Sequence, residues 1–222
     1  LYAQGTDYFE VFGSRALTMA WSEDWCNIAS TYQCCGYNTD VMRAATKYHG
    51  QPLGHYIITS YGRTPLDIKL KTYSALGRGA RTLNSFSYGP YYTGHEPGWY
   101  LNRAAYQAMA ELTREIGGAE DLLLQASRQP APVAILYAVS SDIWASGVNE
   151  LYGFERMHTW MALTHAQVPV DFLSEEDVAR GLLAGYQALY VFGPNLQRTA
   201  AGPTSEWVCG GGTLFLGSGA AV

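Results

Sequence analysis

Segments that favour β-strands alternate with segments of helical periodicity along almost the whole chain. The strand-like segments of the first half are apolar or β-branched, and they lie at 15–21, 55–60 and 80–88. The helical patterns that separate and follow them lie at 38–48, 65–76 and 102–116. This order is typical of βα units whose strands pair in parallel. The sequence therefore predicts an α/β protein.

The helical segments carry signals for their starts and stops. Asn38 or Thr39 is the expected N-cap of the first helix, and Gly50 is expected to close it. Pro65 suits the first turn of the second helix, where apolar residues recur at a spacing that gives one buried face.

A proline-rich stretch at 129–132 (QPAP) separates the two halves and predicts a boundary between domains at 1–128 and 129–222. Strand-like segments of the second half lie at 133–139, 168–173, 188–192 and 213–216. Helical segments lie between them, at 150–165, after Ser174 and at 205–209. Ser174 and Asp177 are spaced close to a capping box. This alternation predicts a doubly wound, flavodoxin-like domain.

Charge and hydropathy exclude several classes of partner. The net charge is −5 and the basic residues are scattered, which argues against a nucleic-acid partner. No apolar run approaches the roughly 18 to 20 residues of a membrane-spanning helix, so we expect no membrane partner. A G-x-G-x-x-G pattern does not follow the strand at 133–139, and no metal-ligand spacing stands out. The sequence thus predicts no cofactor and no metal.

The four cysteines leave two readings open. Cys34 and Cys35 are adjacent, which is not a metal-ligand spacing, and Cys26 and Cys209 lie apart from them. Buried free thiols are the simpler interpretation. A disulfide from Cys26 to one of the adjacent pair is the alternative.

The start of the sequence has neither an initiator Met nor the pattern of a signal peptide, and its end follows directly on a predicted strand. We expect the sequence to be part of a longer chain. Localisation therefore stays open between cytoplasm, periplasm and secretion.

Several short motifs, in their order, carry a resemblance to a known family. In the first half they are 73–80 (YSALGRGA), 83–86 (LNSF) and 94–96 (GHE). These resemble the end of the catalytic barrel of family 42 glycoside hydrolases, the β-galactosidase-like group. In the second half they are 132–137 (PVAILY), 169–172 (PVDF), 186–191 (YQALYV) and 211–214 (GGTL). These resemble the amidotransferase-like, flavodoxin-type domain that follows the barrel and forms trimers in that family.

The resemblance implies a fold and an activity. The first domain would be the C-terminal portion of a (β/α)8 TIM barrel, with its sixth, seventh and eighth strands at 17–21, 56–60 and 82–88. The protein would hydrolyse O-glycosidic bonds of a carbohydrate substrate with retention, and it would be a homotrimer. One departure matters: the family places its nucleophile on the seventh strand, and the segment 57–62 (IITSYG) has no acidic residue.

Acidic and aromatic residues at the end of the first predicted strand are the strongest candidates for a site. Glu23 and Asp24 lie between Trp21 and Trp25, at the strand end where barrel enzymes place catalytic groups. Glycoside hydrolysis requires carboxyl groups, and indole faces can stack on sugars. We therefore predict Glu23 and Asp24 as catalytic and the two tryptophans as substrate-binding. The alternative is that one acid caps the next helix and the tryptophans are packing residues.

Loops on the same predicted rim supply further candidates for substrate binding. They are Tyr61, Tyr88, His95, Glu96 and Trp99. Glu96 matches a loop glutamate that the resembled family carries, though not as its nucleophile.

The second domain lacks the residues for amidotransferase chemistry, because the turn at 191–195 (VFGPN) contains no nucleophilic cysteine. We expect it to have a structural or oligomerisation role. Because the seventh strand lacks its acid, a non-catalytic carbohydrate-binding protein and an assembly protein remain alternatives to the glycosidase.

Overall fold

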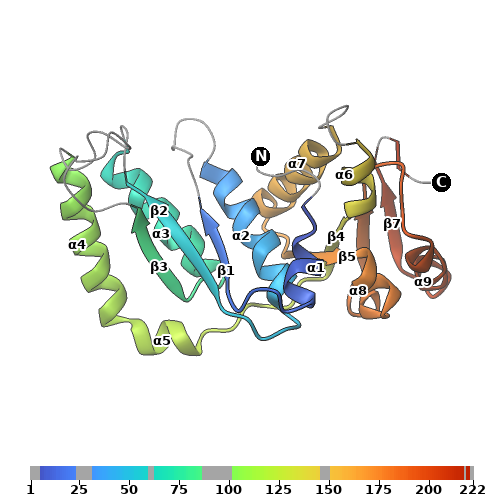
Figure 1. Cartoon of the computed structure of the whole chain (residues 1–222), viewed down its shortest axis with the longest axis horizontal. Coiled ribbons are helices and arrows are strands. Elements are labelled where there is room, and N and C mark those ends of the chain that lie inside the picture. Colours follow the sequence, from blue (N-terminus) through green and yellow to red (C-terminus); the bar gives the residue numbers. More distant parts are fainter. Residues whose placement is uncertain are drawn as a thin grey trace. The chain divides into compact units, whose positions relative to one another are not determined.

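The computed structural model of the chain describes residues 6–23, 32–59, 63–86, 102–145, 151–217 and 219–220 (Figure 1). The chain divides into two compact units. The A unit consists of Leu17–Thr46 and Gly50–Arg128, and the B unit of Leu1–Ala16, Lys47–His49 and Gln129–Val222. Each unit contains one sheet, and every described strand pairs in parallel, which confirms the predicted α/β class.

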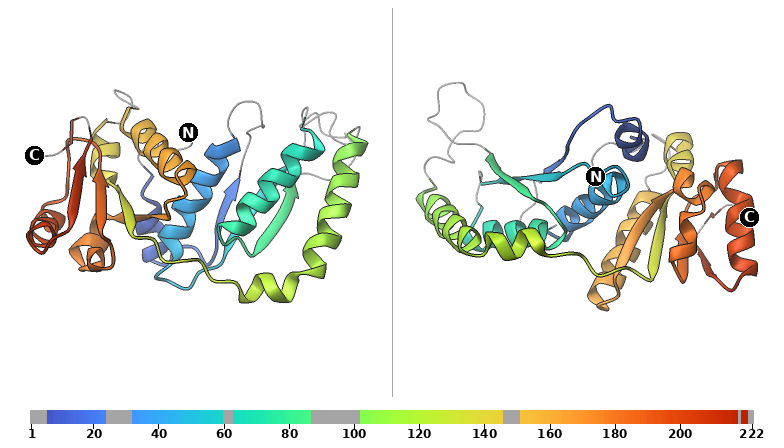
Figure 2. Two further views of the ribbon diagram at one scale, coloured as in Figure 1. Left: turned by 180° about the vertical axis from the view of Figure 1, so that it is seen from behind. Right: turned by 90° about the horizontal axis from the view of Figure 1, so that it is seen from below.

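The A unit is built on three parallel strands in the order β1-β2-β3, which is also their order in the chain. The strands are β1 (Ala20–Glu23), β2 (Leu53–Ile58) and β3 (Thr82–Phe86). The helices are α2 (Tyr32–Thr46), α3 (Pro65–Gly77), α4 (Arg103–Gly118) and α5 (Glu120–Gln125). Helices α2, α3 and α4 lie along one face of this sheet (Figure 2).

The core of the A unit forms between that face and the helices. Ile57 of β2 and Ile68 of α3 are fully buried, and they cluster with Ala105 and Leu112 of α4. The start of α3 follows from its sequence, since Thr64 and Asp67 form a capping box and Pro65 occupies the first turn.

The predicted start of α2 is wrong. The helix begins at Tyr32, so Asn38 and Thr39 lie inside it and neither is its N-cap. The Thr39 hydroxyl instead donates to the backbone oxygen of Cys35 one turn earlier, at 2.7 Å. Gly36 lies inside the helix, and the Arg78 side chain packs directly on it. A Cβ atom added at Gly36 would come within 2.8 Å of the guanidinium carbon, so this close packing requires glycine.

The B unit is built on four parallel strands in the order β5-β4-β6-β7. The strands are β4 (Val133–Tyr137), β5 (Val170–Ser174), β6 (Ala188–Val191) and β7 (Thr213–Leu216). The helices are α1 (Tyr8–Gly13), α6 (Val139–Ala145), α7 (Leu151–His165), α8 (Glu175–Ala179), a 3-10 helix (Leu182–Gly185) and α9 (Arg198–Cys209). Among these, α1, α6 and the 3-10 helix were not predicted, and α9 begins earlier than the predicted 205.

The strand order places helices on both faces of this sheet. The chain moves from β4 to β5 in one direction and then crosses back to β6 and β7 in the other. Right-handed crossovers in opposite directions put their helices on opposite faces. Accordingly, α7 lies on one face, and α8, the 3-10 helix and α9 lie on the other (Figure 2).

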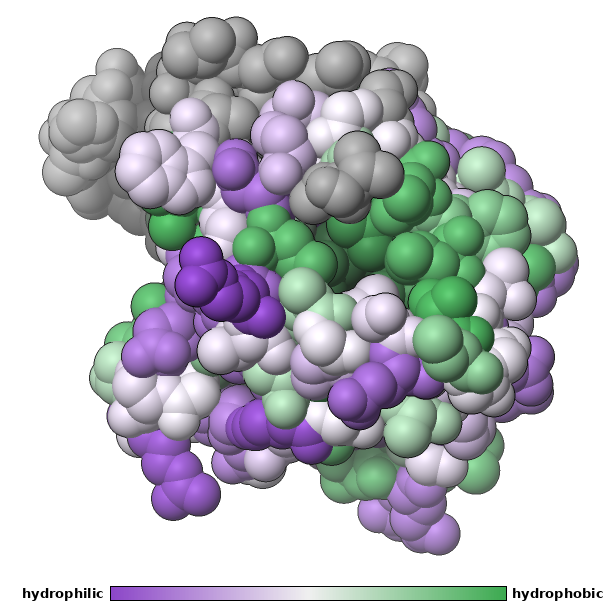
Figure 3. Space-filling view, turned by 90° about the vertical axis from the view of Figure 1, so that its right-hand side faces the viewer, coloured by the Kyte–Doolittle hydropathy of each residue, from purple (hydrophilic) through white to green (hydrophobic). Residues whose placement is uncertain are grey.

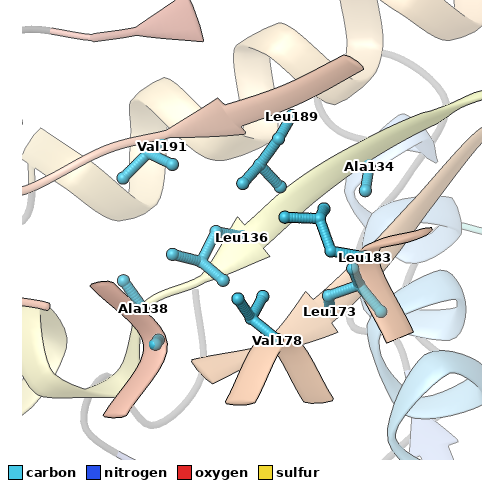
Figure 4. Close-up of a cluster of buried hydrophobic side chains, with 9 residues drawn as sticks. Ala134, Leu136, Ala138, Leu173, Val178, Leu183, Leu189 and Val191 are labelled. Atoms are coloured by element: carbon cyan, nitrogen blue, oxygen red, sulfur yellow. The ribbon is translucent and has the colours of Figure 1, made fainter. Parts of the chain in front are cut away.

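The main core of the B unit lies on the α8 and α9 side. Leu136, Leu173 and Leu189 come from three neighbouring strands, and they cluster with Val178 of α8 and Leu183 of the 3-10 helix. Figure 4 shows these side chains turned toward a common space. The predicted capping box between Ser174 and Asp177 is confirmed, and it starts α8 directly at the end of β5.

The segment Lys47–His49 belongs to the B unit and is fixed there through Lys47. The Lys47 ammonium donates to the Asp171 carboxylate at 2.9 Å, to the backbone oxygen of Phe172 at 2.8 Å and to the Tyr186 hydroxyl at 3.2 Å. The Tyr186 hydroxyl also donates to Asp171, at 2.9 Å. Lys47 and Asp171 are each only 14% exposed, so this ion pair is weakly screened by solvent.

Exposed apolar side chains gather on the side of the B unit that carries β7 (Figure 3). Phe215 and Leu216 of β7 are 44% and 49% exposed, and Val208 of α9 is 38% exposed. The Phe215 ring stacks on Tyr190 of the neighbouring strand, with 4.4 Å between centroids. None of the helices in the described parts of the chain is long and apolar enough to cross a membrane.

Candidate functional site

The carboxyl end of β1 brings two of the predicted site residues to one face of the sheet. Trp21 pairs in register with Gly54 of β2, and Glu23 pairs with Tyr56. Side chains alternate between the two faces along a strand. Trp21, Glu23 and Tyr56 therefore share a face, and this face is opposite to the one on which Ile57 packs against α3 and α4.

Trp21 and Tyr56 form an aromatic surface on that face. Their ring centroids are 4.7 Å apart and the rings are tilted by 33°. Both side chains are partly buried and partly accessible. Flat, partly accessible aromatic rings present the kind of apolar surface that packs against the C–H face of a sugar.

Gly54 makes room for this arrangement. A Cβ atom added at Gly54 would lie 2.7–2.8 Å from three atoms of the Trp21 indole, closer than real Cβ contacts. The indole thus lies directly over the β2 backbone beside Tyr56, and glycine is the residue type that permits this approach.

Glu23 is exposed at the last position of β1. Among the described residues at the carboxyl ends of β1, β2 and β3, it is the acidic one. From this position beside the aromatic surface, the carboxylate could contact a sugar that packs on Trp21 and Tyr56.

The remaining predicted site residues lie outside the described part of the chain. They are Asp24, Trp25, Tyr61, Tyr88, His95, Glu96 and Trp99. Tyr56 was not predicted as a site residue. The sequence places it in an apolar strand, and its neighbour Trp21 is identified only by the pairing of two strands that are distant in the chain.

His55, the histidine on β2, faces the helices rather than the aromatic surface. His55 is buried, and its Nδ1 atom lies 3.3 Å from the Thr39 hydroxyl of α2. His55 alternates with Gly54 and Tyr56 along the strand, so its side chain is on the other face of the sheet. It is a core histidine rather than a partner of Glu23.

A second polar cluster lies at the carboxyl ends of the B-unit strands, around Glu175. This residue is 1% exposed. One carboxylate oxygen accepts hydrogen bonds from the backbone N–H and the hydroxyl of Ser140, each at 3.0 Å, and the other accepts from the backbone N–H of Gln197 at 2.7 Å. Burial raises the pKa of the Glu175 carboxyl above its ordinary value, against the lowering effect of these hydrogen bonds.

Neighbouring hydrogen bonds join the start of α6 to the segment between β6 and α9. The Ser141 hydroxyl donates to the backbone oxygen of Asn195 at 2.7 Å and accepts from its N–H at 3.0 Å. Gly193 has a φ of 92°, and an added Cβ there would come within 2.5 Å of Ser141. The start of α6 and the segment after β6 are thus in close contact.

A buried ion pair fixes α6 to α7 nearby. Arg156 donates two hydrogen bonds to the Asp142 carboxylate, at 2.9 and 2.6 Å, and the side chains are 3% and 6% exposed. The guanidinium also lies 4.5 Å from the centre of the Tyr137 ring. This two-bond geometry joins α7 to α6 beside Tyr137, the last residue of β4.

The described cysteines lie on two helices, α2 and α9. Cys34 and Cys35 are buried in α2, Cys209 is exposed at the end of α9, and Cys26 lies outside the described part. The turn after β6 contains no thiol. Within the described ranges, His, Cys, Asp and Glu side chains form no group of three that could hold a metal ion.

No protein-family model matches the sequence, and no curated protein is significantly similar to it.

Proposed function

We propose that the chain belongs to a carbohydrate-active protein of the β-galactosidase-like type, and that the surface formed by Trp21 and Tyr56, together with Glu23, contacts the sugar. The observation that carries the proposal is the joint position of two partly accessible aromatic rings and one exposed carboxylate on the same face, at the carboxyl end of parallel strands. Active sites of (β/α) barrels form at this end of their strands.

The order and direction of the strands in the A unit support the proposed barrel fold. Its three strands are parallel and follow one another in sequence order, with helices along one face. This is the arrangement of consecutive βα units in a (β/α)8 barrel, where helices cover the outside and the other face lines the interior. We therefore propose that β1, β2 and β3 correspond to the sixth, seventh and eighth strands of such a barrel.

The proposed reaction is hydrolysis of a glycosidic bond with retention. In that reaction one carboxylate attacks the anomeric carbon, and the bond to the leaving oxygen breaks as a second carboxyl group, about 5–5.5 Å away, protonates that oxygen. A water molecule, deprotonated by the same second group, then attacks the anomeric carbon, which releases the sugar and regenerates the first carboxylate. We assign the first role to Glu23. Trp21 and Tyr56 would hold the ring against the strand ends and exclude water from one side of it.

The B unit fits an assembly role in this proposal. Its strand order, numbered within the unit, is 2-1-3-4, as in the flavodoxin-like order 2-1-3-4-5. The exposed apolar side chains of β7 and α9 would suit contact with further copies in a trimer. Size-exclusion chromatography with light scattering of wild type and Phe215→Glu tests this: an unchanged mass would contradict the role of β7.

A panel of aryl β-glycosides, tested for turnover and for binding, tests the proposed activity. If the Glu23 carboxylate stabilises the transition state by ~3 kcal/mol or more, the Glu23→Gln variant should lose at least 100-fold in kcat. The matched control is Glu120→Gln, which changes an exposed acid on α5 of the same unit. If both variants retain the wild-type rate, the assignment of Glu23 is wrong.

A non-catalytic carbohydrate-binding protein is the second candidate, and the absence of an acid from β2 (Leu53–Ile58) favours it. In that case the panel would show no turnover, while sugar binding would be present and would be lost in Trp21→Ala. If neither turnover nor binding is found for any sugar, both candidates fail and a purely structural role follows.

A further inference from the structure

The B unit has a position where doubly wound proteins commonly bind their ligands. In such sheets the strand order reverses between two neighbouring strands, and ligands bind in the crevice beyond the carboxyl ends of those strands. Here the reversal lies between β4 and β6. The first turn of α6, which follows β4, contains Ser140, and Gln197 is the residue before α9, which follows β6; the N–H groups of both donate to Glu175.

The donors around Glu175 form a site for a single carboxylate. Two backbone N–H groups and one hydroxyl point at its two oxygens, at 2.7–3.0 Å. The donors come from segments that are 35 and 22 residues away from Glu175 in the chain, so only the folded unit assembles them. Backbone N–H groups that converge in this way are typical of anion-binding sites.

The surroundings hold the donors in place without the carboxylate. The Ser141 hydroxyl forms hydrogen bonds with both the N–H and the oxygen of Asn195, and so it joins the start of α6 to the segment between β6 and α9. The Ser174–Asp177 capping box separately fixes the start of α8, in which Glu175 is the first residue. The three donors should therefore keep their positions when the Glu175 side chain is shortened.

We propose that Glu175 is the built-in ligand of an anion cradle, the set of donors made by Ser140 and Gln197, and that its carboxylate excludes external anions from the carboxyl ends of β4 and β6. The cradle selects a small monocarboxylate. A phosphate is tetrahedral and more highly charged, and it would lie beside the Glu176 carboxylate, which accepts a hydrogen bond from the Gln197 side chain. This proposal does not depend on the proposed carbohydrate function.

Glu175→Ala makes the cradle testable with a matched ligand. The substitution removes a CH2–COO− group, and acetate carries the same carboxylate with one methyl group. In the full-length chain at pH 7, we expect Glu175→Ala to lower the Tm of the B unit. Acetate at several times its dissociation constant should raise that Tm by about 2–4 °C relative to chloride at equal ionic strength.

Controls separate a specific cradle from a general salt effect. Acetamide has the shape of acetate without its charge and should give no rise. Wild type, in which the cradle is full, should not respond to acetate, and neither should Glu176→Ala, which changes the adjacent carboxylate. Ser140→Ala combined with Glu175→Ala removes the hydroxyl donor and should weaken the response to acetate.

The outcomes decide the proposal. An equal response of Glu175→Ala to acetate and chloride would overturn it, as would a rise in the wild-type Tm with inorganic phosphate that Ser140→Ala abolishes. If Glu175→Ala does not fold by itself, refolding from urea in acetate or chloride gives the answer: a higher yield in acetate supports the cradle, and equal yields contradict it.

Discussion

Adding one methyl group at Gly54 tests the packing on which the aromatic surface depends. An alanine in a strand is normally more stable than a glycine by about 0.5–1 kcal/mol, because glycine loses more backbone freedom on folding. At this position, however, the new Cβ would lie 2.7–2.8 Å from the Trp21 ring. Relieving such overpacking costs about 1–3 kcal/mol. We therefore expect Gly54→Ala to destabilise the A unit despite the better strand residue.

The same substitution in a Trp21→Ala background supplies the control. Without the indole the clash is absent, so Gly54→Ala should become stabilising by about 0.5–1 kcal/mol. The difference between the two backgrounds, about 1–3 kcal/mol or more, is the coupling between the two positions. Urea unfolding followed by far-UV circular dichroism measures all four proteins. An equal effect of Gly54→Ala in both backgrounds would refute the packing of Trp21 on β2.

Three further predictions concern a core residue of the A unit, the buried ion pair of the B unit and the pKa of Glu175. Ile57→Ala should lower the free energy of unfolding of the A unit by about 2–5 kcal/mol, measured in urea, because Ile57 is fully buried. Asp142→Ala should cost the B unit about 3–5 kcal/mol, because it removes the carboxylate that pairs with the buried Arg156 guanidinium; Arg156→Met added to it should recover part of the loss in the same assay. The raised pKa of Glu175 means that the folded state holds its proton more tightly, so the protonation-dependent part of its contribution to stability is present below the ordinary value of 4.5 and is lost as pH rises through the folded pKa, while the hydrogen bonds to the carboxylate remain. The Tm of wild type relative to Glu175→Gln should therefore fall from pH 4 upward, and a rise would contradict it.

Periodicity and capping signals were sufficient to predict the fold class and most of the elements. The capping box at Ser174 is a local signal, and it depends only on residues within one turn. The early start of α2 could not be found in this way, because it includes Gly36, whose place in a helix depends on packing against Arg78 far along the chain. Tertiary contact there overrides a weak local propensity.

The candidate site was predictable only in part for a similar reason. Strand-end position and residue type indicated Trp21 and Glu23. Tyr56 joins them through the register of β1 on β2, and a shift of that register by one residue would move its ring to the other face. Glu175 gave no sequence signal, because its partners Ser140 and Gln197 come together only when three strands are aligned.

The three-part composition of the B unit has a consequence for how the protein can be divided. A polypeptide that begins at Gln129 would contain all four strands of the B sheet but would lack Lys47. The Asp171 carboxylate, which lies on an edge strand, would then lose the ammonium that approaches it at 2.9 Å, and so would the backbone oxygen of Phe172. Cutting at the proline-rich linker would therefore not separate the A unit from a complete B unit, because the B unit includes the Lys47 ammonium from the first half of the chain.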